Sequence, residues 1–93
     1  MIIGAMTVEA SLPEAQSLKD KRRIVKGLKE RLRNRFNISI AETGYADSFS
    51  RAQLAVVTVA DETRFVHSVL DKIVDQLRTV HGFTLIDYER EIL

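Results

Sequence analysis

The residues with the clearest chemical potential in this sequence are the lysines and arginines of one short segment. Residues 19–35 hold nine of the fourteen basic residues against two carboxylates, a net charge of +7, whereas the rest of the chain carries −6. The protein is nearly neutral in total but strongly polarised, and a concentrated positive field attracts anions. The chemistry of this segment therefore depends on whether its cations share one surface.

Helical periodicity places most of these cations side by side. At 100° per residue the segment has an apolar stripe that must face a core. Lys21 and Arg35 are expected at the border of that stripe, where long side chains reach past it to water. Next to the stripe, six cations occupy an arc of about 120° and form a continuous band about 21 Å long. We call this band the basic ribbon, and its members are Lys19, Arg22, Arg23, Lys26, Lys29 and Arg33.

Three interpretations of the basic ribbon are open. Like charges three or four residues apart repel, and a helix under selection only for stability or solubility would interleave acids among them. RNA phosphates would remove that repulsion, so we expect the ribbon to contact RNA, with a ribosomal particle as one source. The alternatives are docking on the acidic surface of a second subunit and a solvated face without a partner. A membrane role is disfavoured, because the core needs the apolar stripe.

A turn further along the chain offers a second contact. Tyr45, Phe49 and Arg51 lie in or beside it, and aromatic rings and guanidinium groups stack on unpaired bases. Packing within the turn is the simpler role for the two rings. The strands also lack the aromatic-rich motif of an RNA-recognition module.

No arrangement typical of catalysis or of metal binding is evident. The chain has no cysteine, its four glycines are far apart, and His67 and His81 have no partner at metal-ligand spacing. Asp87, Glu89 and Glu91 alternate along an expected strand. They would suit a divalent cation or a basic partner, but a charged edge strand that resists aggregation is favoured. We therefore expect no enzyme, no metal and no cofactor.

The hydropathy pattern predicts the element order β-α-β-β-α-β within one domain, residues 1–93. Ser17 is expected to cap the first helix, Asp61 the second, and Gly82 to follow the end of the second. A phase change in the last strand indicates a bulge. The expected strands are residues 2–12, 37–46, 52–60 and 83–92, and the second helix is residues 62–80.

This order predicts a ferredoxin-like α+β sandwich, a four-stranded antiparallel sheet with two helices on one face. Residues 52–60 are apolar on both faces, which is typical of a central strand. The helices cover only one face, so Ile3 and Ala5 are expected on an open face that a second copy could cover. A structural or regulatory homo-oligomer is therefore the alternative to RNA binding, and a small-molecule-binding domain is a third option.

The N-terminal residues show no charged region followed by a long apolar run, and no segment approaches the roughly 20 apolar residues of a membrane span. We therefore expect a cytoplasmic protein.

The run AQSLKDKRRIVKGLKERLRNRFNISIAE, residues 15–42, resembles the signature of the bacterial YlxP-like family. The opening MIIG and the strand QLAVVTVA extend the resemblance over nearly the whole chain. The resemblance implies a ferredoxin-like fold and, through the genes among which members are often encoded, a role connected with RNA or ribosomes. It implies no catalytic residues. Relatives often carry a tryptophan in the turn where this chain has Phe49.

Overall fold

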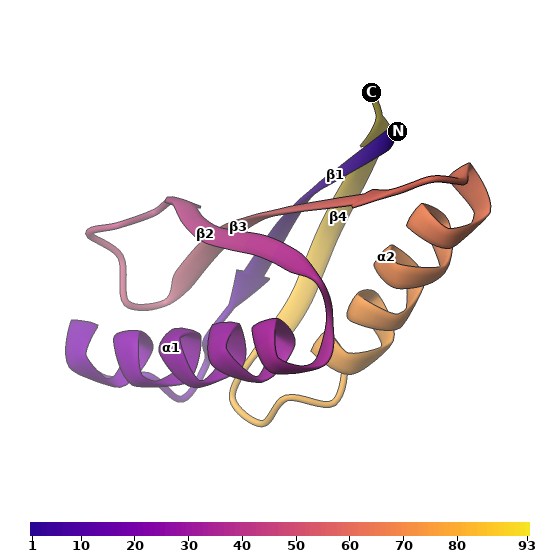
Figure 1. Cartoon of the computed structure of the whole chain (residues 1–93). Coiled ribbons are helices and arrows are strands. Elements are labelled where there is room, and N and C mark those ends of the chain that lie inside the picture. The colour runs from indigo at the N-terminus through magenta and orange to yellow at the C-terminus, as the bar shows by residue number, and fades with distance from the viewer.

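The structure, a computed structural model, describes residues 1–93 and has the predicted order of elements. The four strands form one antiparallel sheet in the order β2-β3-β1-β4, and both helices lie on the same face of it (Figure 1). The ferredoxin-like βαββαβ fold is therefore confirmed. The elements are β1 (Ile2–Ser11), α1 (Leu18–Arg35), β2 (Ile38–Gly44), β3 (Arg51–Ala60), α2 (Thr63–Leu77) and β4 (Thr84–Ile92).

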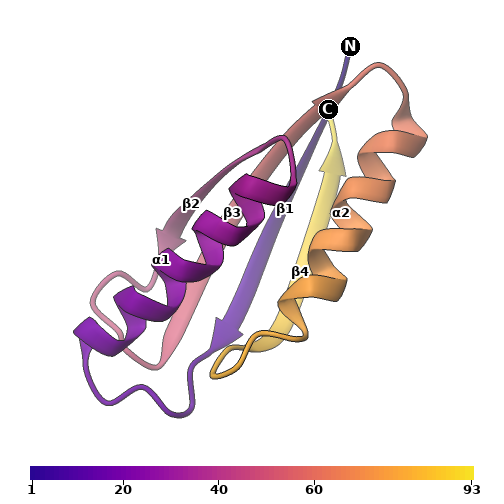
Figure 2. The ribbon, with the colours of Figure 1, turned by 60° about the horizontal axis from the view of Figure 1, so that its bottom comes forward.

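The core lies between this face of the sheet and the two helices. Figure 2 shows the helices side by side, α1 towards β2 and α2 towards β4. Strands bury every second residue, as Val8 in β1 and Leu54 in β3 show, and α1 contributes Leu28 and Leu32. The central places of β1 and β3 confirm what the two-sided hydrophobicity of residues 52–60 indicated. The opposite face of the sheet carries no helix.

The start of α1 follows the sequence pattern. The Ser17 hydroxyl accepts a hydrogen bond from the Asp20 N–H at 3.1 Å, so Ser17 is the predicted N-cap. The Asp20 carboxylate in turn accepts from the Gln16 N–H at 3.0 Å. This variant of the capping box fixes where α1 begins, and burial of its apolar stripe sets which side of the helix faces outward.

The predicted limits of α2 were wrong at both ends. Its N-cap is Glu62, not Asp61, and the Glu62 side chain makes no capping hydrogen bond. The helix ends at Leu77 rather than residue 80: the Thr79 N–H donates to the Gln76 carbonyl, three residues back, at 3.0 Å, and the Thr79 hydroxyl donates to the same carbonyl at 2.8 Å. Gly82 therefore does not cap the helix. It lies in the turn before β4 with φ of +75°, a conformation that suits glycine.

The bulge indicated by the last strand is confirmed. Glu9 of β1 pairs with Asp87, whereas Ala10 pairs with Leu85, so Ile86 is the extra residue on β4. Leu85 packs against the core, and Ile86 is exposed. The shift places Asp87, Glu89 and Glu91 together on the open face of an edge strand.

Candidate nucleic-acid interface

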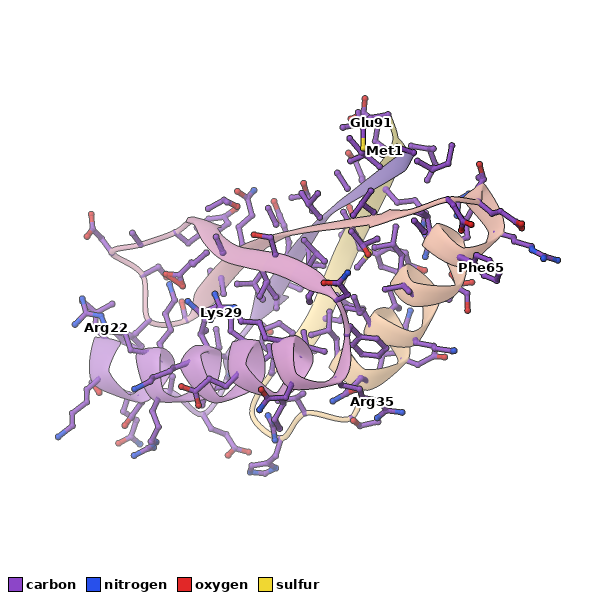
Figure 3. All side chains as sticks on the ribbon, viewed as in Figure 1. Met1, Arg22, Lys29, Arg35, Phe65 and Glu91 are labelled. Carbon is purple, nitrogen blue, oxygen red and sulfur yellow. The ribbon has the colours of Figure 1, made fainter.

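The basic ribbon lies on the outer side of α1 next to β2, and most of its cations have no partner within the chain. Arg22 and Lys29 extend from α1 on the side nearest β2 (Figure 3). Apart from Lys29, which is half-buried, the members are exposed. The members that make no side-chain hydrogen bond or ion pair are Lys19, Arg22, Lys26 and Lys29.

The two remaining ribbon members have weak or neutral partners. Arg23 lies 3.5 Å from the Asp20 carboxylate on the exposed surface, and such pairs contribute at most about 1 kcal/mol. The Arg33 guanidinium donates to the backbone carbonyl of Ile40 in β2 at 2.8 Å. This bond leaves the charge of Arg33 uncompensated and fixes the C-terminal part of the ribbon beside the edge of the sheet.

The expectation that Lys21 reaches past the border of the apolar stripe to water was wrong. Its side chain is 1% exposed rather than reaching water. The ammonium donates to the carbonyls of Tyr45 and Ser48, both at 2.6 Å, and lies 3.6 Å from the Glu42 carboxylate. Lys21 therefore attaches the β2–β3 loop to α1. Its angle on the helical wheel, between those of Leu28 and Leu32, was the signal that this lysine faces inward.

The turn with Tyr45, Phe49 and Arg51 adjoins the N-terminal half of α1 because Lys21 holds it there. The rings of Tyr45 and Phe49 are 43% and 44% exposed. Arg51 is engaged within the chain: its guanidinium lies 5.1 Å from the centre of the Tyr45 ring and 3.3 Å from the Glu9 carboxylate. The two rings are accessible, whereas Arg51 is directed to the open face of the sheet.

The open face is acidic rather than basic along β4 and β1. Pairing places Asp87 opposite Glu9, and Glu89 and Glu91 continue the row on the same face. Arg51, already paired with Glu9, is the basic residue of this face. A phosphate backbone would be repelled by this face of the sheet.

The two histidines have separate surroundings. His67 Nδ1 lies 3.2 Å from the Arg90 guanidinium, and His81 Nε2 lies 3.3 Å from the Glu14 carboxylate. No group of three histidine, aspartate or glutamate side chains is arranged to hold a metal ion. Neither helix combines the length and the apolar character that crossing a bilayer requires.

A family model described as "Protein of unknown function (DUF503)" matches residues 3–90. The chain belongs to the DUF503 family. Its resemblance to YlxP-like proteins is confirmed by the uncharacterized protein YlxP of Bacillus subtilis (strain 168), which is 37% identical over 59 residues. The match covers 63% of this DUF503 chain and 64% of YlxP, so it spans somewhat less than two thirds of the relative.

Solved structures similar to this DUF503 protein include two designed proteins. The designed protein LFR1 1, with a ferredoxin fold, gives a TM-score of 0.58 at 19% identity, over 99% of this chain and 85% of its own. The designed protein Foldit4 gives a TM-score of 0.57 at 9% identity, over 100% and 97%. At such identities the likeness shows the fold alone.

Proposed function

We propose that this DUF503 protein binds RNA through phosphates aligned along the basic ribbon. The observation that carries the proposal is the absence of any internal partner for four of the six ribbon cations, on a helix whose other side is buried. Their spacing of three or four residues presents a row of cations along one side of α1. Such a row contacts a phosphate backbone without reading base edges, so affinity depends on charge more than on sequence.

The acidic open face disfavours RNA binding on the sheet. Bases that stack on strands would bring phosphates close to Glu9, Asp87 and Glu89. The β2–β3 loop instead lies by the N-terminal half of α1. The exposed ring of Phe49 on this loop supplies a secondary stacking contact for an unpaired base, whereas the Tyr45 ring lies against Arg51, which pairs with Glu9. Structured RNA with exposed loops, as on a ribosomal particle, offers both features.

Charge reversal within the ribbon tests this proposal. In fluorescence anisotropy with a structured RNA, contact with four phosphates predicts a roughly 10²-fold loss of affinity between 50 and 200 mM salt. We expect Lys26→Glu/Lys29→Glu to weaken binding at least about tenfold at low salt. The slope of log affinity against log salt should fall by about 1.4 to 1.8, as loss of two phosphate contacts requires.

The matched control is Lys72→Glu/Arg78→Glu, which changes net charge equally at an exposed position of α2 and at the exposed residue that follows its end. Long-range attraction to total charge would weaken both variants alike, whereas a local interface weakens only the ribbon variant. Equal affinities for the two variants would exclude the ribbon as the RNA contact.

A homo-oligomer assembled through the open face is the second candidate. Val57 and Val59 are 42% and 48% exposed there. With Met1 and Ile3 they line a shallow groove of about 420 Å³. Covering exposed aliphatic side chains of this kind contributes about 25 cal/mol per Å² of apolar surface, and a dimer would carry two basic ribbons.

Sedimentation velocity at micromolar concentration tests the second candidate. We expect an oligomer that Val57→Lys/Val59→Lys converts to monomer, because the lysines bring charge into the contact. Thr84→Lys, at an exposed position at the end of the sheet far from this groove, should leave the oligomer intact. A wild-type protein that sediments as a monomer throughout would refute this candidate.

A further inference from the structure

The outer edge of β2 presents backbone groups that no neighbouring strand uses. The Leu12 N–H donates to the Ser50 carbonyl at 2.9 Å, which sets the phase of pairing between β1 and β3. By alternation, the even-numbered residues of β3 hydrogen-bond to β1, and Ala55 and Val57 hydrogen-bond to β2. Their partners in β2 are Ala41 and Ser39. The backbone groups of the alternate β2 residues, Ile38, Ile40 and Glu42, therefore point out of the sheet.

The hydrogen bond from Arg33 agrees with this phase, since it reaches the Ile40 carbonyl from outside the sheet. The Ile38 N–H is also taken, by the Phe36 carbonyl at 3.0 Å. The groups left without a strand partner are the N–H of Ile40, both groups of Glu42 and the carbonyl of Ile38. These outward N–H and C=O groups lie on alternate residues, which is the spacing at which a neighbouring antiparallel strand forms its hydrogen bonds.

The two edges of the sheet differ in the charged side chains beside them, which are more numerous on β4 than on β2. The Tyr88 N–H points outward but donates to its neighbour's carboxylate, Asp87, at 2.9 Å. Charged side chains line β4, and Arg90 is held by Asp71 at 2.8 Å. β2 contains no proline and no lysine, the usual means of blocking an edge. The edge of β2 is therefore less obstructed by charged side chains than the edge of β4.

The positive charge beside the β2 edge determines which side chains an added strand would carry. Arg33 anchors the basic ribbon to Ile40, and Lys29 and Arg22 continue the ribbon along the side of α1 next to β2 (Figure 3). Glu42, on the same face, is engaged by Lys21 and does not neutralise the ribbon. Every second residue of an added strand would point towards these cations, and the others would lie beside the small side chains of Ser39 and Ala41 on the open face.

We propose that the β2 edge binds an extended acidic peptide segment as a fifth strand, with carboxylates at alternate positions facing the basic ribbon. Backbone hydrogen bonds supply affinity and the ribbon selects the charge, which is the general mode of strand addition. A second copy pairing through its own β2 would bring two positive ribbons together, which like-charge repulsion opposes. This inference stands apart from RNA binding, although both ligands would meet the same cations.

The test uses a labelled peptide of alternating threonine and glutamate, seven residues long to match β2. A peptide of the same composition with its three glutamates in one block is the control. We expect the alternating peptide to bind at least about tenfold tighter than the block peptide. Lys29→Glu should weaken it on the order of tenfold, whereas Lys72→Glu should not.

Amide hydrogen exchange on the intact protein supplies the geometric readout. Binding of the alternating peptide should slow exchange at Ile40 and Glu42 by at least about tenfold, because those N–H groups gain strand partners. An RNA oligonucleotide should occupy the ribbon without this protection, so failure of RNA binding and failure of strand addition are distinguishable.

Three results would overturn the inference. These are peptide binding without protection of Ile40 and Glu42, equal affinity for the block peptide, and protection in the peptide-free protein that rises with its concentration. The last would show that a second copy occupies the edge.

Discussion

Replacing Lys21 with methionine is expected to lower the free energy of unfolding by about 3 kcal/mol and to release the β2–β3 loop from α1. Lys21 is the charged residue with the greatest burial, and its ammonium supplies hydrogen bonds to the carbonyls of Tyr45 and Ser48. Hydrogen bonds to a charged group contribute about 1.5–3 kcal/mol each. The Glu42 carboxylate, 3.6 Å away, would also lose its cation.

A competing effect limits the size of the loss. Methionine keeps most of the apolar stem of Lys21 in place, and exchanging buried ions for apolar groups is sometimes neutral when all partners change together. Here only one partner changes, and two carbonyls and a carboxylate remain. Tyr45 and Ser48 are partly exposed, so water reaches their carbonyls once the loop moves. The net loss is therefore smaller than the sum of the hydrogen bonds.

Urea denaturation measures this effect, with Lys29→Met as the matched control. Lys29 lies on the same helix and has no partner within the chain, so its replacement should change stability by no more than about 0.5 kcal/mol. Hydrogen exchange should accelerate in residues 45–50 in the Lys21 variant alone. Coincident denaturation curves for the two variants would mean that the buried ammonium does not hold the loop.

The fold followed from patterns that act within single elements. Alternation along residues 2–12 indicated a strand with one buried face, and the two-sided hydrophobicity of residues 52–60 indicated a central strand. The basic ribbon was predictable for the same reason. Once residues 18–35 form a helix, its 3.6 residues per turn decide which cations lie together.

The features that escaped prediction depend on contacts between elements. Lys21 lies on the inward side of α1. Only the path of the β2–β3 loop brings two backbone carbonyls within hydrogen-bonding distance of its ammonium. The early end of α2 coincides with hydrogen bonds of Thr79 to the carbonyl three residues back, which the hydropathy pattern does not show. The open edge of β2 required the pairing phase between β1 and β3, which hydropathy does not encode.

At Gly4 in β1 the side chains of α2 pack closely against the strand, and Gly4→Ala is expected to destabilise the protein by about 2–3 kcal/mol. A Cβ at this position would overlap Cγ1 of Val66 and lie 3.4 Å from Cδ1 of Leu70. Val66 is fully buried in α2, and a β-branched side chain in a helix has one strongly preferred rotamer. The valine cannot turn aside, so α2 must move off the sheet. This cost exceeds the 0.4–1 kcal/mol that alanine gains through the unfolded state.

Gly27→Ala provides a control of opposite sign. Gly27 lies within α1, and a Cβ there meets nothing within 4 Å, so alanine should stabilise the protein by up to about 1 kcal/mol. Thermal or urea unfolding of both variants separates a steric effect from the general effect of removing a glycine. The double variant Gly4→Ala/Val66→Ala should lose less stability than the two single losses added together, because removing Cγ1 makes room for the new methyl. If the two stability losses add exactly, the cost of Gly4→Ala does not arise from the contact between β1 and α2, because only a shared contact couples the two substitutions.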